Sequence, residues 1–213
     1  MKARHQNQYP ACATEEISNL RQHFRGLGLV AATLLGTLGS AQAQFNQTEE
    51  TPLDLDLCTV VQSDDFGSTW ACPGHKGIPV MIAERDQHFM VSFGLTSTTE
   101  PAAKQTLPPK NEVGGKIEWR ISNASGAYKP FAAIVPYLTE PPKAEAGKEP
   151  APEGRILVVT RIEPGKTCQI AWIDATANTD ATELARKTAD EKAPDFDCAN
   201  PPEMVGTFEA WKP

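Results

Sequence analysis

His75 is the residue of this sequence with the clearest capacity for chemistry. It stands in the segment CPGHKGIPV, whose glycines indicate a turn that presents the imidazole to solvent as a candidate general base. Glu84 and Asp86, in AERDQH, are a second candidate, because residues two apart on a strand share a face and could act as paired carboxylates. Simpler interpretations are favoured: His75 as a surface histidine in a turn, and Glu84 with Asp86 as the end of a hairpin.

Other catalytic arrangements are missing from the sequence. It contains no Gly-x-Ser-x-Gly motif, no cysteine–histidine pair in a plausible context and no glycine loop that leads into a helix as in phosphate sites. Asp64 and Asp65 lie in the turn-rich SDDFG and are interpreted as turn formers rather than as a catalytic pair. Single tryptophans in strands more often belong to a core than to a sugar site, and this chain has Trp70, Trp119, Trp172 and Trp211. An enzyme is therefore not favoured, and no cofactor is expected.

The cysteines point to disulfides. Cys12 lies in the N-terminal leader described below, and an even number remains in the rest of the chain: Cys58, Cys72, Cys168 and Cys198. In an exported chain these favour two disulfides, with three connectivities between which the sequence does not decide. We prefer Cys58 with Cys72 and Cys168 with Cys198, because each pair closes a short local loop. A metal site is not expected, because there is no Cys-x-x-Cys pair and His75 and His88 lie 13 residues apart.

An export signal is indicated near the N-terminus. Residues 27–38 read LGLVAATLLGTL, an uncharged apolar run preceded by basic residues and followed by the small residues Ala41 and Ala43. A membrane anchor needs about 20 apolar residues, so this run is too short to span a bilayer. We expect residues 1–43 to be a leader with a signal peptide that is cleaved before Gln44, and no later segment is apolar enough for stable membrane insertion.

The charge of the remaining chain limits its partners. Four of the 20 basic residues and two of the 27 acidic ones lie in this leader, so the rest carries 16 against 25 and a net charge of −9. Such a charge repels phosphate backbones, and no cluster of Lys or Arg offsets it, so nucleic acid is not an expected partner. A basic envelope protein is the kind of partner that this charge attracts, whereas the oligomeric state stays open.

Short strands make up most of the expected structure. Runs of β-branched and aromatic residues, each bounded by Gly, Pro, Asn or Asp, occur at 57–62, 68–72, 78–84, 88–94, 116–122, 130–138, 155–162 and 168–174. In one of them, Ile117, Trp119 and Ile121 alternate with polar residues, which is typical of a strand with one face in water. On that wet face, we expect Glu118 and Arg120 to pair with opposite charges on neighbouring strands.

The other segments complete a single domain. Residues 44–56 are polar and acidic and are expected to be a flexible tether, and 140–154 a flexible surface loop or, alternatively, a segment that binds a partner. A helix is predicted after the cap Asn178-Thr179-Asp180, with Ala181, Leu184, Ala185, Thr188 and Ala189 on its apolar face and Pro194 as its stop. The run at 205–211 is expected to add an edge strand. One disulfide-stapled β-rich domain thus spans 57–213.

Three segments carry a family resemblance. WACPGHKGIPV, QTLPPKNEVGGKIEWRISNASG and IDATANTDATELARKTADEKAPDFDC together resemble a group of uncharacterised secreted proteins of alphaproteobacteria. The likeness covers nearly all of the chain after the leader. It implies a place in the bacterial envelope, periplasmic or secreted, and supplies neither an activity nor site residues.

The predicted fold class is α+β, with a mostly antiparallel sheet of about seven or eight short strands, one helix near the C-terminus and two disulfides. A curled sheet or partial barrel is favoured over a two-sheet sandwich. The predicted function is that of a non-enzymatic binding or inhibitor-like module of unknown ligand, because small stapled domains without catalytic motifs act through their surfaces. The alternatives are an envelope enzyme that uses His75 with nearby carboxylates, or a structural protein of the envelope.

Overall fold

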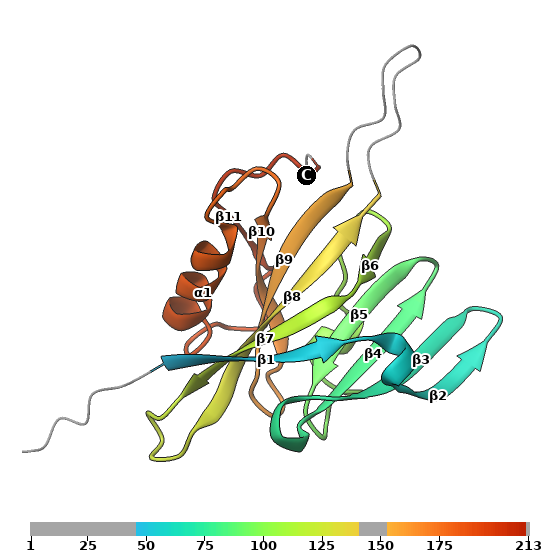
Figure 1. Cartoon of the computed structure of the whole chain (residues 1–213), viewed down its shortest axis with the longest axis horizontal. Helices are drawn as coiled ribbons and strands as arrows, with labels where there is room; N and C mark the ends of the chain where they lie inside the picture. Colours follow the sequence, from blue (N-terminus) through green and yellow to red (C-terminus); the bar gives the residue numbers. More distant parts are fainter. Residues whose placement is uncertain (1–45, 141–152, 212–213) are drawn as a thin grey trace, which may run out of the picture. The chain divides into compact units, whose positions relative to one another are not determined.

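The computed structural model describes residues 46–140 and 153–211, and every count below refers to these residues. They form eleven strands, one α-helix and three short 3₁₀ helices (Figure 1). The strands are β1 Asn46–Leu53, β2 Thr59–Asp64, β3 Gly67–Pro73, β4 Pro79–Arg85, β5 His88–Phe93, β6 Asn111–Val113, β7 Gly115–Ser122, β8 Lys129–Thr139, β9 Gly154–Arg161, β10 Cys168–Asp174 and β11 Glu203–Val205. The helices are η1 Leu55–Leu57, η2 His75–Gly77, η3 Pro101–Lys104 and α1 Ala181–Lys192. The predicted leader, 1–43, and most of the predicted loop at 140–154 lie outside the described residues.

Two sheets carry the fold. The larger one has seven strands in the order β1-β7-β8-β9-β10-β11, with β6 also paired to β8. All its pairs are antiparallel except the short parallel pair between β10 and β11. The smaller sheet is a four-stranded antiparallel meander, β2-β3-β4-β5. These are the large and small sheets below.

The large sheet is covered on both faces (Figure 1). On one face, Trp119 and its neighbours pack against Ile82, Val91 and Phe93 of the small sheet. On the other face, residues of β8, β9 and β10 pack against Ala185 and Ala189 of α1. Because both faces are buried, the central strands are almost continuously apolar, as in PFAAIVPYL, rather than alternating.

The predicted fold class is confirmed: the domain is mostly β, with one helix near its C-terminus and two disulfides, and it is not closed into a barrel. All eight predicted strands form. They divide between two sheets that share a hydrophobic core, and do not form the single curled sheet or partial barrel that was favoured. The 3₁₀ helix η1 lies between β1 of the large sheet and β2 of the small sheet. The predicted edge strand at 205–211 forms earlier, at Glu203–Val205, where the chain runs beside β10.

The expectation of a flexible tether at 44–56 is wrong for Asn46–Leu53, which form β1. This strand pairs along its whole length with β7, from Asn46 opposite Ser122 to Leu53 opposite Gly115. Most of its side chains are polar, but Leu53 lies in the core, and Thr51 accepts a hydrogen bond from the indole of Trp119 at 2.9 Å. Backbone pairing and such bonds hold a strand whose composition alone does not predict one.

Both preferred disulfides are present. Cys58–Cys72 joins the start of β2 to the end of β3, and Cys168–Cys198 joins the first residue of β10 to the turn that follows α1. The second bridge thus fastens the end of the helical segment to the large sheet. The helix runs over Ala181–Lys192 and buries Ala181, Ala185, Thr188 and Ala189, as predicted. The predicted cap is not made by a side chain, because Asp180 gives no capping hydrogen bond.

Candidate functional site

His75 lies in the core and not in a solvent-facing turn as expected. It is 8% exposed, and its ring lies 6.1 Å from that of Trp119. The turn is tight because Gly74 passes directly over Trp119 and the carbonyl of Ile78: a Cβ on Gly74 would lie 2.2 Å from that oxygen. Within 46–140 and 153–211, no hydrogen bond or ion pair joins the imidazole to a carboxylate. His75 therefore contributes to the packing of the core beside Trp119.

The two acidic pairs end hairpins. Glu84 is the second-last residue of β4, and its carboxylate accepts a hydrogen bond from the Gln87 backbone at 2.7 Å. Asp86 and Gln87 both have positive φ, 52° and 62°, which makes the two-residue turn that suits an antiparallel hairpin. Asp64 accepts a bond from the Phe66 backbone at 2.9 Å, and this bond lowers the pKa of the Asp64 carboxyl. The interpretation of these residues as turn formers is confirmed.

The tryptophans serve packing in three places. Trp119 is fully buried between the sheets, and Trp70 stacks on Phe89 at the open end of the small sheet, with ring centroids 6.3 Å apart. Trp172 and Trp211 form an edge-to-face pair at 5.8 Å, beside the C-terminal segment. Each of the four tryptophans thus contacts another aromatic ring of the domain.

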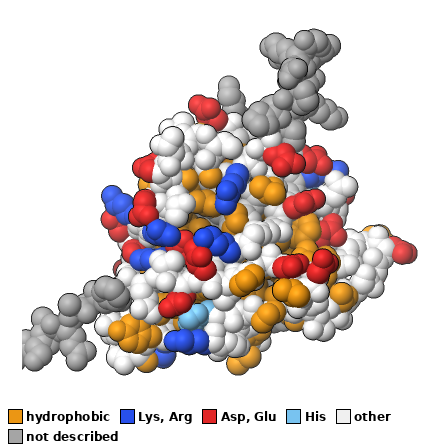
Figure 2. Space-filling view, in the orientation of Figure 1, with side chains coloured by type: hydrophobic (Ala, Val, Ile, Leu, Met, Phe, Trp, Pro, Cys, Tyr) orange, Lys and Arg blue, Asp and Glu red, His pale blue; other side chains and the backbone are white. Residues whose placement is uncertain are grey.

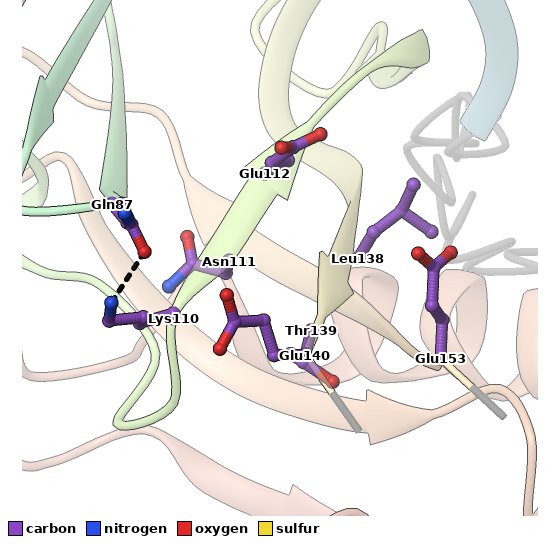
Figure 3. Close-up of a pocket in the computed structure, with 8 residues that line it drawn as sticks. All are labelled: Gln87, Lys110, Asn111, Glu112, Leu138, Thr139, Glu140 and Glu153. Atoms are coloured by element: carbon purple, nitrogen blue, oxygen red, sulfur yellow. Dashed lines mark hydrogen bonds between the residues drawn. The ribbon is translucent and has the colours of Figure 1, made fainter. Parts of the chain in front are cut away.

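A hollow of about 360 Å³ lies where the β4–β5 hairpin meets β6 and the ends of β8 and β9. Glu112, Glu140 and Glu153 line it, together with Lys110, which donates to the Gln87 side chain at 2.5 Å. Figure 3 shows the three carboxylates pointing in different directions. The described residues contain no group of three or more His, Cys, Asp or Glu that could hold a metal ion. The hollow thus has negative charge without a convergent set of ligands.

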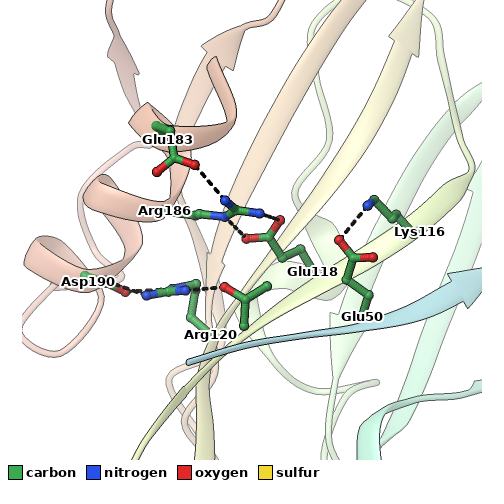
Figure 4. A network of polar contacts seen from close by, with 8 residues as sticks. Glu50, Lys116, Glu118, Arg120, Glu183, Arg186 and Asp190 are labelled. Atoms are coloured by element: carbon green, nitrogen blue, oxygen red, sulfur yellow. Dashed lines mark hydrogen bonds and ion pairs between the residues drawn. The ribbon is translucent and has the colours of Figure 1, made fainter. Parts of the chain in front are cut away.

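The densest polar cluster joins α1 to the large sheet (Figure 4). Arg186 donates two hydrogen bonds to Glu118, at 2.6 and 2.9 Å, and one to Glu183, at 2.6 Å. Arg120 makes a matching two-pronged contact with Asp190. The prediction of a wet face on β7 is therefore wrong: Glu118 and Arg120 are only 6% and 7% exposed, because α1 covers them and supplies their partners. This cluster is satisfied internally and fixes the helix.

The strand β2 differs from every other part of the described surface. All six of its residues are exposed, and it pairs only with β3. Val60 and Val61 are 56% and 58% exposed, and Leu57 and Phe66, on either side of the strand, 72% and 77%. An edge strand with exposed apolar side chains offers its unpaired N–H and C=O groups to another chain.

The other free edges are protected. At the outer edge of the large sheet, β1 carries Glu49, Glu50 and Pro52, and β11 has three residues, of which Glu203 is paired with Lys192. The far edge of the small sheet is contacted by the segment after it, because the side chain of Asn111 accepts a bond from the Phe89 backbone. Among the edges within 46–140 and 153–211, the edge at β2 is the one that combines length with apolar side chains. It contains a bulge between Val60 and Gln62.

Carboxylates lie at both ends of this edge. Asp54 and Asp56 precede β2, and Asp64 and Asp65 end it, whereas the sequence from residue 46 to residue 75 contains no Lys or Arg. Arg85 on β4 also lowers the pKa of Asp64, but less than the hydrogen bonds from Phe66 and Gln62 do. We call β2 with its four aspartates and the exposed side chains of Leu57, Val60, Val61 and Phe66 the acidic edge.

The sheet behind the acidic edge extends its apolar surface. The face of the small sheet turned away from the large one carries Ala71, Met81, Ala83 and Met90, all of them half-buried. In Figure 2 hydrophobic side chains are exposed over the small sheet with acidic ones among them, whereas basic and acidic side chains alternate over α1. The sequence predicted the β2–β3 hairpin, but not that β2 would be an edge.

Comparison with protein-family models, with curated proteins and with solved structures finds no significant match to this chain. The described residues also contain no helix with the length and hydrophobicity that a membrane crossing requires.

Proposed function

We propose that this protein is an exported, non-enzymatic binding module, periplasmic or secreted, that engages a basic protein partner through the acidic edge. The observation that carries the proposal is the exposed apolar strand β2 between two pairs of aspartates. Apolar side chains supply contact area at an interface, and complementary charge speeds the encounter and sets its specificity. A basic cell-wall lytic enzyme, which the module would inhibit or position, has the required charge.

Export is part of this proposal. Its support is the apolar run at 27–38 with small residues at Ala41 and Ala43, and the two disulfides, which persist in oxidising compartments. Mass spectrometry of the protein from the producing cell should find Gln44 at the N-terminus and no free thiol. A cytosolic product that keeps residues 1–43 and has reduced cysteines would contradict export.

The binding claim is tested with the exported protein and a periplasmic extract at about 50 and about 500 mM salt, since screening at high ionic strength weakens contacts between exposed charges. Proteins retained at low salt are identified, purified and titrated against the wild type and two variants. Asp64→Asn with Asp65→Asn removes charge from the acidic edge and keeps an oxygen for the Phe66 hydrogen bond. Asp180→Asn with Asp195→Asn removes the same charge beside α1, from exposed side chains without hydrogen bonds in the described structure.

The proposal expects a basic partner whose affinity falls with salt and falls again in the variant of the acidic edge, with the α1 variant unchanged. Equal affinity of both variants, or retention of acidic proteins only, would place the interface elsewhere. A partner whose affinity does not change with salt concentration would contradict the electrostatic basis of the proposal.

A further inference from the structure

We infer that the partner contributes an extended segment that adds to the small sheet as a fifth strand beside β2, with apolar residues in its middle and Lys or Arg at its ends. This inference rests on the proposed function and specifies how the acidic edge binds. It predicts a contact made largely by backbone hydrogen bonds, with side chains supplying selection.

The backbone of β2 is the first part of the argument. In the described structure its pairing partner is β3 alone, so along its outer side alternate residues present N–H and C=O groups to solvent. Six strand residues, at about 3.3 Å each, give an edge of about 20 Å, long enough for a short extended segment.

The side chains define the middle of the ligand. Val60 lies in one cross-strand row with Trp70, Ile82 and Val91, and this row runs from the open edge into the core. Ile82 and Val91 are buried, and Trp70 is half-buried. A β-branched or aromatic residue of an added strand, placed beside Val60, would continue this row and cover its exposed end.

The charges define the ends of the ligand and exclude a second copy of this chain. Two copies that paired antiparallel along β2 would bring Asp64 and Asp65 of one copy towards Asp54 and Asp56 of the other, and like charges that face each other across strands are destabilising. An antiparallel segment, the kind of pairing that β2 already makes with β3, meets an aspartate pair at both ends if it carries a basic residue at each end.

The experiment uses synthetic peptides with the mature, oxidised protein at low salt, and measures affinity by calorimetry or fluorescence. The probe has alternating valine and threonine between terminal lysines. Two further versions carry N-methyl groups on alternate residues, one on the odd and one on the even positions. Because an added strand donates N–H groups to β2 from one edge only, one methylation pattern should weaken binding at least about tenfold, and the other should leave it nearly unchanged.

Substitutions in the protein locate the site. Asp64→Asn with Asp65→Asn should lower the affinity for the probe by about 3- to 10-fold, as expected for the loss of two exposed charge pairs. Asp180→Asn with Asp195→Asn should leave this affinity unchanged. Val60→Thr keeps the β-branched shape and the strand while removing apolar contact, so it should also weaken binding.

Each contrary result overturns the inference. Equal binding of both methylated probes would mean attraction by charge alone, which leaves the proposed function standing without strand addition. No binding of the unmethylated probe would reject the extended ligand, even where a folded basic partner still binds. A protein that is dimeric at low salt and is made monomeric by the probe would assign the edge to a second copy.

Discussion

Arg120, on the helix side of β7, holds the carboxylate of Asp190 on α1 with two hydrogen bonds, from Nε at 2.8 Å and from Nη2 at 2.6 Å. Its third nitrogen donates to Thr48 of β1. One buried side chain thus ties together the helix, the central sheet and the N-terminal strand. One turn earlier on α1, Arg186 is bonded to Glu118 in the same way, and these bonds raise the pKa of the Arg186 guanidinium.

Replacing Arg120 with alanine should destabilise the domain by about 3 kcal/mol. The change leaves Asp190 and Thr48 without their partner under a helix, and breaking one side of a buried ion pair costs about 3 to 5 kcal/mol, less where one member is partly exposed. Urea unfolding at neutral pH measures the difference. Lys187→Ala is the matched control, because the Lys187 side chain is 69% exposed and its one ion pair in the described part of the chain is with Glu191 on the same helix. This change should lower the free energy of unfolding by no more than about 0.5 kcal/mol.

Asp174 should make stability depend on acid pH. Its buried carboxylate accepts bonds from Thr176, Ala177, Glu209 and Ala210. Burial alone would raise the pKa of this carboxyl, but the hydrogen bonds outweigh burial and lower it. The carboxylate therefore stabilises the fold above about pH 4, where the unfolded chain is already ionised, and this contribution is lost as the pH falls towards the lowered pKa.

Asp174→Ala should cost about 3 kcal/mol at pH 7, because several donors lose one buried acceptor. The difference in free energy of unfolding between the wild type and the variant should be smaller at pH 3 than at pH 7. Urea unfolding at both pH values measures it. A gap that stays constant between them would show that the ionised form has no special role. Proteolysis at the C-terminus should also become faster in the variant, since Glu209 and Ala210 are held by this carboxylate.

Gly74→Ala should be among the most destabilising single changes in the chain, with a loss of at least about 3 kcal/mol. The added Cβ would lie 2.2 Å from the Ile78 carbonyl oxygen and 2.9 Å from the Trp119 ring, and neither is the free end of a flexible side chain. Near-UV circular dichroism of the tryptophans and thermal unfolding check this together. Gly126→Ala is a suitable control for the steric clash, because nothing lies within 4 Å of its added Cβ. Its φ of +77° adds some backbone strain.

Each disulfide should stabilise the domain by about 3 to 4 kcal/mol, since they close loops with sequence separations of 14 and 30 residues. Replacing Cys168 and Cys198 together with alanine should loosen the end of α1, whereas replacing Cys58 and Cys72 should loosen the start of β2. Amide exchange mapped along the chain separates the two effects. The same pattern of exchange in both double variants would mean that the bridges act only through the unfolded state.

Local patterns predicted the strands well, because each run of apolar and β-branched residues ends at a turn residue. The run PFAAIVPYL became β8 and CQIAWID became β10, and the apolar face of α1 was placed correctly. The cysteine spacing favoured the pairs that form. Each of these features depends on residues that are close together in the sequence. The periodicity of apolar residues therefore predicts them directly.

Features set by distant residues could not be predicted in this way. Glu118 and Arg120 look like a solvated face until α1, about 70 residues away, covers them. Asn46–Leu53 look like a tether until β7 pairs with them, and His75 looks exposed until Trp119 and Gly74 enclose its turn. The acidic edge depends on strand order, which no local pattern specifies. The one signal in the sequence was the run LCTVVQ in a stretch without Lys or Arg.

Hydrogen–deuterium exchange of the oxidised protein, free and saturated with the lysine-ended peptide, tests the acidic edge most directly. Strand addition predicts that exchange slows in Thr59–Asp64, while the amides of α1 and β11 keep their rates. Saturated binding with unchanged exchange across Thr59–Asp64, or with slowing confined to α1, would contradict the assignment of β2 as the binding strand.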